Sequence, residues 1–290
     1  MHKQRAALLS ILSNTVLIIF KIAAGILMGS ISVISEAVHS SIDLFASMVA
    51  YISIKKAGEP ADHDHPFGHG KYENISGFFE AMLIFFAAAM IIYEAVKKLF
   101  HPIEVERLGW GIIVMFVSFV VNIVISRILF TTAKKSGSIA LEADAMHLSA
   151  DVYTSLSVMA GLAVIKLTHW EILDPVIAIV VACLIGKVSM DLTKKSVRDL
   201  ADQSLPDSEL QSIGRILQGY PQVLNYHKLR TRKSGDQREI DIHITMEKTT
   251  SLECAHDLCY QIENNIKAAF PGSHITLHVE PDHGDKTNNN

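Results

Sequence analysis

Two segments of this chain repeat the same ionisable residues at the same spacing. In each segment an acidic residue is followed by histidine three positions later and by aspartate four positions after that, which puts all three on one face of a helix. The residues are Glu36, His39 and Asp43 in the first segment and Asp144, His147 and Asp151 in the second. Ionisable side chains inside apolar helices are costly and usually functional, so the repetition indicates a site.

The repeated His–Asp pair is suited to holding a metal ion. His39 with Asp43, and His147 with Asp151, each present one imidazole and one carboxylate side by side. Two such helices facing each other would close a shell of two nitrogens and two oxygens at about 2.0–2.2 Å, which suits zinc. The alternative is a pair of buried His–Asp hydrogen bonds that lock two helices together. For the leading acid of each segment, a supporting role at the site and a solvated role stay equally open.

A second cluster of metal-binding residue types lies between these segments. Residues 62–69 read Asp-His-Asp-His-Pro-Phe-Gly-His. Pro66 and Gly68 prevent a regular helix, so the ligands would be presented from a bent chain. The alternative is a solvated loop that binds metal only loosely, and the ligand set within the loop stays open.

The composition predicts that both repeated segments lie in a membrane. Hydrophobic residues make up 49% of the 290 residues and charged residues 19%, and the mean hydropathy is +0.28. Six apolar segments are each near the ~20 residues that a helix needs to cross a bilayer. They are residues 7–28, 30–55, 75–100, 110–132, 141–167 and 172–190. We interpret the first as a span and not a signal peptide, because it carries Lys21 and leads into five more segments.

The positions of the basic residues predict the orientation, because Lys and Arg are retained on the cytoplasmic side. With the N-terminus inside, the outer loops receive mainly Lys97, Lys98 and Arg107. The inner side receives Lys3, Arg5, Lys55, Lys56, Lys71, Lys134, Lys135, Lys194, Lys195 and Arg198. We therefore expect both termini in the cytoplasm.

After about residue 200 the sequence becomes that of a small α+β domain. A helix is predicted over 207–219, strands over 225–233 and 238–247, a helix over 251–270 and a last strand over 273–280, giving the order αββαβ. The fold class is thus a six-helix membrane domain (1–200) followed by a cytoplasmic domain (201–284), with a disordered polar tail (285–290).

Alternation along the strands of this domain separates a core face from a polar face. Ile240, Ile242 and Ile244 point to one side, and His243 points to the other. The groups that could then converge on a metal ion are His227, His243, His256, His278 and Glu280. The alternative is a set of ordinary surface histidines on an open sheet face.

Several classes of function are disfavoured. A net charge of −4 and a pI near 6.4 do not indicate a nucleic-acid-binding protein. Three cysteines are too few for a disulfide framework or a thiolate zinc site. An intramembrane zinc protease would need a His-Glu-x-x-His pair, which the sequence lacks, so no enzyme is predicted. A passive metal channel and a metal-sensing membrane scaffold stay open.

These features together resemble the cation diffusion facilitators, which are dimeric metal/proton antiporters. The resemblance covers nearly the whole chain. It rests on the six spans, the paired His–Asp motifs, Asp174-Pro175 before the sixth span, the 65–71 loop His-Pro-Phe-Gly-His-Gly-Lys, and the αββαβ domain.

The resemblance implies roles for individual residues. It assigns the transport site to His39, Asp43, His147 and Asp151, and a second metal site to Asp62, His65 and His69. It implies a binuclear zinc site between two cytoplasmic domains, formed by His227, His243, His256, His278 and Glu280, with Glu280 standing where Asp is common. It also implies a charge contact between Lys71 and Asp202 that fixes the dimer. Histidine at position 39, where some iron- or cadmium-tolerant members carry Asp, is similar to the zinc-selective pattern.

The resemblance thus implies a homodimer in the bacterial inner membrane that exports Zn²⁺ in exchange for protons, with zinc as both substrate and structural ion. Met146, beside His147, is a candidate for an apolar gate, and a packing or lipid-facing role is an equal alternative. Efflux of Fe²⁺, Cd²⁺, Co²⁺ or Mn²⁺ by the same fold is the nearest alternative, followed by the metal-sensing scaffold.

Overall fold

The computed structural model describes residues 2–28, 31–100, 111–168 and 172–282. The chain divides into two compact units, Met1–Val197 and Arg198–Asn290. The predicted disorder of residues 285–290 lies outside the described residues.

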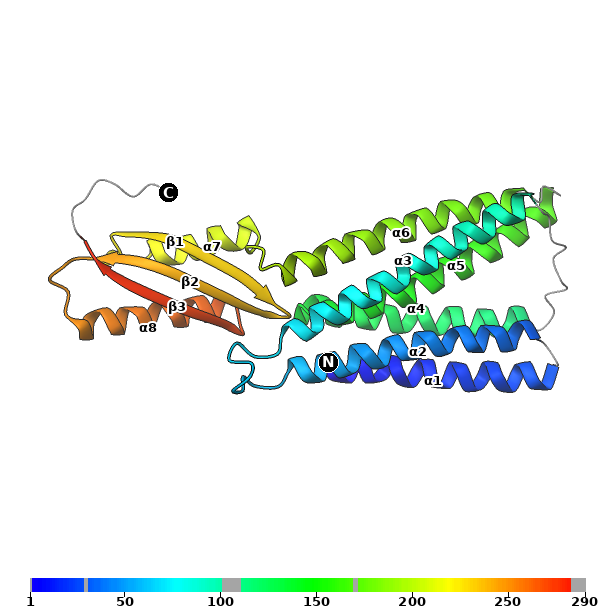
Figure 1. Ribbon diagram of the computed structural model, residues 1–290, viewed down its shortest axis with the longest axis horizontal. Coiled ribbons are helices and arrows are strands. Elements are labelled where there is room, and N and C mark those ends of the chain that lie inside the picture. Colours follow the sequence, from blue (N-terminus) through cyan, green and yellow to red (C-terminus); the bar gives the residue numbers. More distant parts are fainter. Residues whose placement is uncertain (1, 29–30, 101–110, 169–171, 283–290) are drawn as a thin grey trace. The chain divides into compact units, whose positions relative to one another are not determined.

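The first unit is built from six long helices. They are α1 (Lys3–Met28), α2 (Ile31–Ala57), α3 (Lys71–Phe100), α4 (Gly111–Ser136), α5 (Ile139–Thr168) and α6 (Leu173–Leu200). Each of the six predicted spans coincides with a helix. The ends agree within a few residues except in α6, which continues to Leu200 beyond the predicted end at 190. Consecutive helices run in opposite directions (Figure 1), so the start of α1 and the end of α2 lie on one side. We call this the N-terminal side, and the other the far side.

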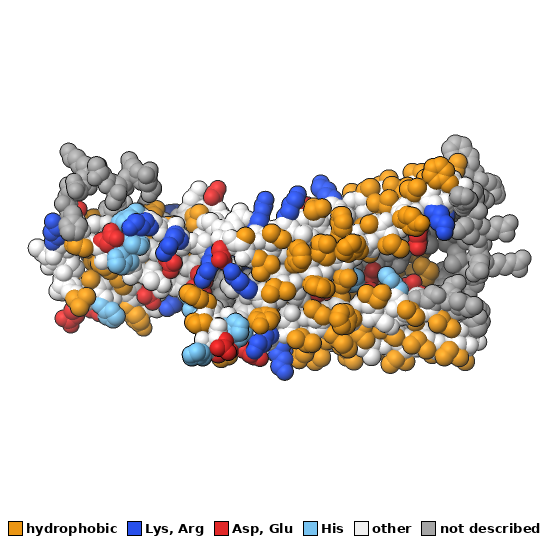
Figure 2. Space-filling view, in the orientation of Figure 1, with side chains coloured by type: hydrophobic (Ala, Val, Ile, Leu, Met, Phe, Trp, Pro, Cys, Tyr) orange, Lys and Arg blue, Asp and Glu red, His pale blue; other side chains and the backbone are white. Residues whose placement is uncertain are grey.

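Length and composition make this unit a multi-pass membrane domain. Among the described residues, α1, α2, α3, α4 and α6 are each long and apolar enough to cross a bilayer. Helix α5 falls outside this set, and its first half carries Glu142, Asp144 and Asp151. It nevertheless packs against α2, α3 and α4 as a member of the same bundle. Hydrophobic side chains cover much of the face of this unit that Figure 2 shows, as a surface facing lipid requires.

Small residues let the helices approach one another closely. One core cluster joins Ala6 and Ala7 of α1 to Ala133 of α4 and Ala140 and Ala145 of α5. Such contacts favour association of helices in a membrane. Lipid tails are as apolar as leucine, so apolar side chains gain little by leaving lipid, and close packing between helices supplies the attraction. Helix α5 is thereby fixed at the centre of the bundle, where it carries half of the repeated motif.

The second unit has the predicted order αββαβ. Its elements are α7 (Asp207–Gln218), β1 (Asn225–Ser234), β2 (Gln237–Met246), α8 (Leu252–Ala269) and β3 (Ser273–Pro281). The sheet order is β1-β2-β3, with β1 antiparallel and β3 parallel to β2. Ser234 pairs with Gln237 across a tight hairpin, where Gly235 takes a φ of 62°. Glycine suits this left-handed conformation because it has no Cβ.

One face of this sheet forms the core of the second unit. Ile240, Ile242 and Ile244 of β2 are almost fully buried and pack with Ile213 of α7 and Ile262 of α8. Both helices therefore cover the isoleucine face. The polar face, which carries His243, is not covered by either helix, and this leaves its histidines available for a site.

Candidate metal centre

The two repeated motifs converge in the helical unit. His147 Nε2 of α5 lies 3.0 Å from Asp43 Oδ1 of α2. His39, Asp43 and Asp151 each offer a ligand atom, and these atoms lie within 4.8 Å of one another. The four residues, called the tetrad below, therefore surround one point between α2 and α5. The donor set of two imidazoles and two carboxylates fits a four-coordinate zinc ion.

The described residues leave the tetrad open toward the far side. His39 is exposed and Asp151 is half-buried. One turn toward the far side, the Glu36 side chain is 44% exposed. One turn toward the N-terminal side, Ser47 and Asp144 are fully buried. Figure 2 shows histidine and acidic side chains in a hollow of the otherwise hydrophobic surface of this unit.

A buried polar network closes the N-terminal side of the tetrad. Ser47 Oγ donates to Asp144 Oδ1 at 2.9 Å, and Asn14 Nδ2 donates to Ser47 Oγ at 3.0 Å. Ser10 Oγ lies 3.1 Å from Ser47 Oγ. The network joins α1, α2 and α5 directly behind the tetrad. Asp144 is therefore buried and not solvated, and its supporting role at the site stays a prediction.

Glu36 has a different environment from its counterpart Asp144. Lys21 Nζ of α1 donates to Glu36 Oε1 at 3.0 Å and to Ser40 Oγ at 2.7 Å. The Lys21 side chain is only 4% exposed. Glu36 is thus partly solvated and ion-paired to α1, which ties α1 to α2 one turn from the tetrad.

Sequence reasoning did not single out Lys21 or Glu80 as candidate site residues. Glu80 lies in α3, is 1% exposed, and contacts no hydrogen-bond donor among the described residues through either carboxylate oxygen. In both cases an ionisable residue inside an apolar span could have indicated a functional role from the sequence. Neither residue belongs to a repeated motif, and for that reason neither was selected.

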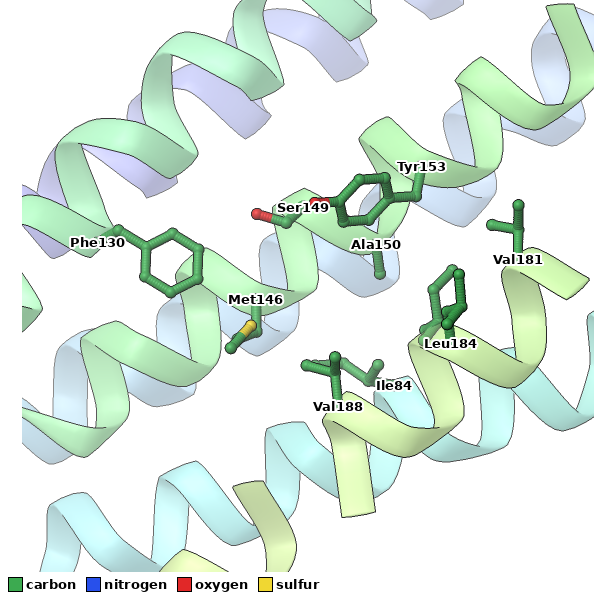
Figure 3. Close-up of a pocket in the computed structure, with 10 residues that line it drawn as sticks. Ile84, Phe130, Met146, Ser149, Ala150, Tyr153, Val181, Leu184 and Val188 are labelled. Carbon is green, nitrogen blue, oxygen red and sulfur yellow. The ribbon is translucent and has the colours of Figure 1, made fainter. Parts of the chain in front are cut away.

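The candidate gate residue Met146 lines an apolar cavity of about 450 Å³. Figure 3 shows Met146 beside Ala150 and Tyr153 of α5, with Phe130 of α4 and Val188 of α6 on other sides. Met146 therefore points to a different face of α5 from His147. Met146 also packs against the buried clusters that contain Ala81 and Ile84. Its role as a gate stays a prediction.

The loop between α2 and α3 brings together the three residues that the family resemblance selected. Asp62, His65 and His69 offer ligand atoms within 4.8 Å of one another. The His69 side chain is fully buried, and its Nε2 lies 3.3 Å from Asp62 Oδ2. The backbone N–H of His65 donates to Asp62 Oδ1 at 2.7 Å and holds the pKa of this carboxyl below its usual range. The carboxylate is thus charged and oriented toward both imidazoles, as a metal ligand must be.

The open face of the tail sheet carries a third cluster. Glu280 Oε1 lies 2.8 Å from His243 Nδ1, and Glu280 Oε2 lies 3.1 Å from His227 Nε2. The His243 contact lowers the pKa of the Glu280 carboxyl. The His278 ring lies 4.5 Å from the His243 ring. The two distances from Glu280 show that its side chain reaches the imidazoles of both His227 and His243. A β-bulge follows His227 in β1, where Lys228 takes a φ of 49°.

One predicted convergence is not formed within a single chain, and one predicted contact joins residues of different units. His256 is exposed on α8, and α8 covers the isoleucine face of the sheet, so His256 does not join His227, His243 and Glu280. Lys71 and Asp202 belong to different units, and their contact stays a prediction. Within its own unit, Asp202 Oδ2 lies 3.4 Å from Arg232 Nη1.

Comparisons with known proteins match both units of the chain. The family model of the cation efflux transmembrane domain matches residues 7–201, and that of the cation efflux protein cytoplasmic domain matches residues 205–282. An uncharacterized transporter of Synechocystis sp., sll1263, is 37% identical over 262 residues, which are 90% of this chain and 84% of that protein.

Two further similar proteins are a named cation-efflux pump and a solved domain of a transporter. The cation-efflux pump FieF of Citrobacter koseri is 31% identical over 277 residues, covering 96% of this chain and 92% of that one. A solved structure of the metal-bound C-terminal domain of the CzcD transporter from Thermotoga maritima is 28% identical, with a TM-score of 0.26, and covers 29% of this chain and 100% of that chain. From the family matches and the full-length relatives, the chain belongs to the cation diffusion facilitator family and is a cation efflux transporter, not an enzyme.

Proposed function

We propose that this transporter carries Zn²⁺ out of the cytoplasm in exchange for protons, with the tetrad as its transport site. The observation that carries the proposal is the convergence of His39, Asp43, His147 and Asp151 from two segments far apart in the sequence. A metal ion and protons compete for such ligands, because imidazole and carboxylate must be deprotonated to bind metal. Exchange of one for the other follows when the site opens to opposite sides in turn.

Zinc is the ion that this donor set favours. Two imidazoles and two carboxylates suit tetrahedral Zn²⁺, whereas harder ions such as Mn²⁺ prefer oxygen ligands in octahedral geometry. His39 supplies the second imidazole. Replacement of this one side chain by a carboxylate would shift the site toward harder ions.

The N-terminal side is the cytoplasmic side in this proposal. Its helix ends carry Lys55 and Lys56 on α2 and Lys134 and Lys135 on α4. Basic residues near helix ends are retained in the cytoplasm, which supports both termini inside and an inner-membrane location. The exposure of His39 toward the far side then corresponds to the state that releases metal outside.

The loop and tail clusters are proposed to hold zinc that stays with the protein. His227, His243, His278 and Glu280 form the part of the tail site supplied by one chain. His256, exposed on the other side of the sheet, is available to a second copy, in keeping with a homodimer. Lys71 and Asp202 are proposed to add a charge contact to this assembly.

The experiment is zinc flux into proteoliposomes of the purified protein, with and without an imposed pH gradient. Zinc uptake that follows the pH gradient and is abolished in Asp151→Ala supports the antiporter. Asp191→Asn is the matched control, because Asp191 is exposed on α6, away from the tetrad. Gradient-independent uptake would indicate a channel, and wild-type flux in Asp151→Ala would remove the tetrad from the transport path. Parallel assays with Fe²⁺, Cd²⁺ and Mn²⁺ rank the metals.

A further inference from the structure

Glu80 is a buried acid that the transport site does not use. It is 1% exposed on α3, and neither Oε1 nor Oε2 meets a hydrogen-bond donor among the described residues. Burying a carboxylate without a donor or a cation costs several kcal/mol. A proton removes that charge, so the environment of Glu80 favours a group that carries a proton.

Asp144 of α5 is an acidic neighbour of Glu80. Ala81, next to Glu80 on α3, lies in one buried cluster with Ala143, next to Asp144 on α5, and the two carboxyl groups interact electrostatically. Asp144 is also one helical turn from His147 of the tetrad. Its Oδ1 accepts from Ser47, whereas its buried Oδ2 contacts no donor among the described residues. Two buried acids on neighbouring helices thus lie close to the tetrad with oxygens that have no donor among the described residues.

Buried polar side chains continue from Glu80 to the N-terminal surface. Ser76, one turn earlier on α3, and Ser196 of α6 are buried and hold hydroxyls without a partner among the described residues. At Gly77 the helices come close, and a Cβ there would lie 3.3 Å from Ser196 Oγ. One turn further, buried Glu73 accepts from Ser138 Oγ and from Lys3 Nζ, the latter at 2.7 Å.

From this arrangement we propose that Glu80 is the proton-carrying residue on the cytoplasmic branch of the transport path, with Asp144 as its link to the tetrad. The proposal rests on the proposed zinc/proton exchange. When metal enters the tetrad, the displaced proton bonds to Asp144 and then to Glu80. It leaves past Ser76, Ser196 and the buried Glu73 toward the cytoplasmic side. Chains of buried acids have this role in other membrane transporters.

The test separates net transport from metal exchange in proteoliposomes. Net zinc uptake driven by a pH gradient needs a proton to move for each cycle. Exchange of labelled for unlabelled zinc at equal pH on both sides needs no net proton movement. Glu80→Gln keeps the shape and burial of the side chain but cannot carry a proton, so the variant should lose the first activity and keep the second.

In Glu80→Gln, net uptake should fall by about a hundredfold, the lower end of what a positioned proton carrier contributes, while zinc exchange stays within about twofold of wild type. Glu94→Gln is the control, because Glu94 is exposed on the same helix. Retention of net uptake in Glu80→Gln would overturn the proposal, and so would equal loss of uptake and exchange, which indicates a structural or metal-binding role. If the wild type itself shows no gradient-driven uptake, the proposed exchange fails before Glu80 is tested.

Discussion

His147 and Asp43 are 104 residues apart in the chain, yet His147 Nε2 and Asp43 Oδ1 lie 3.0 Å apart between α5 and α2. Both side chains are at least nine-tenths buried. The contact links the two copies of the repeated motif, and Asp43 lies in the same ligand cluster as His39 and Asp151.

The first prediction concerns the charge of Asp43. Asp43→Asn keeps an oxygen that can accept from His147 but removes the negative charge. The helices should therefore stay packed, while the zinc affinity falls by more than about a hundredfold. A loss of this size exceeds that caused by changing a group that only supports a ligand. Zinc titration calorimetry and thermal unfolding of the detergent-solubilised protein measure the two quantities. Unchanged affinity would exclude Asp43 as a ligand, and Asp191→Asn controls for a generic loss of charge.

The second prediction concerns the loop cluster. Asp62→Asn retains the Oδ1 that accepts from the backbone of Asp64 and His65, and removes the charge facing His69. Zinc binding at the loop should weaken by about tenfold or more, while flux through the tetrad stays within about twofold. Equilibrium binding of labelled zinc and proteoliposome flux check both halves. A large loss of flux would place the loop in the transport path.

The third prediction concerns the tail. Glu280 contacts both His227 and His243, so Glu280→Gln should reduce zinc bound per tail domain and weaken zinc-dependent dimerisation. Analytical ultracentrifugation of the full chain, with zinc and with chelator, measures the effect. Glu263→Gln is a matched control, because Glu263 pairs with Lys267 on α8 and not with the histidines. Equal dimerisation of both variants would contradict a role for the tail cluster in assembly.

The fourth prediction is a pH dependence of tail stability. Arg238 donates from Nε and Nη2 to Glu209 at 2.8 and 3.0 Å and lowers the pKa of the Glu209 carboxyl. The pair stabilises the domain above the unfolded pKa of about 4.3, and this stability is lost as pH falls through the lower folded pKa. At pH 7, Glu209→Gln should cost about 0.5 to 1 kcal/mol, because the pair is bidentate but partly exposed.

Hydrogen exchange of β2 peptides in the full chain measures this difference. Wild type and Glu209→Gln should differ at pH 7 and converge in acid, as the pH falls through the lowered folded pKa of Glu209. A gap that persists in acid would show that the effect of the substitution arises from packing and not from the charge.

The helices, the strands and the tetrad could be predicted from the sequence because they depend on local periodicity. Apolar length defined the six spans, period-two alternation defined β2, and the repeated spacing identified the tetrad. The contact between His147 and Asp43 depends on the relative position and rotation of α2 and α5. No local sequence pattern determines how these two helices pack. The pairing of Lys21 with Glu36 was missed for the same reason.

The position of His256 could have been deduced from the sequence. Helix α8 must cover the isoleucine face of the sheet to bury its own Leu258 and Ile262. A side chain on that helix cannot reach the histidines on the opposite face of the same sheet. Glu80, by contrast, had neither a partner nor a repeat in the sequence, and its relation to Asp144 depends on the packing of α3 against α5.

The most direct test of the account is the coordination of zinc in a variant that lacks the other two clusters. Asp62→Asn, His65→Ala, His243→Ala and Glu280→Gln together remove the loop and tail sites and leave the tetrad intact. X-ray absorption should then show one zinc per chain with four nitrogen and oxygen ligands at about 2.0–2.2 Å, two of them imidazole. This signal should disappear when Asp151→Ala is added. Zinc that stays bound with an unchanged spectrum after Asp151→Ala would contradict the tetrad as the transport site.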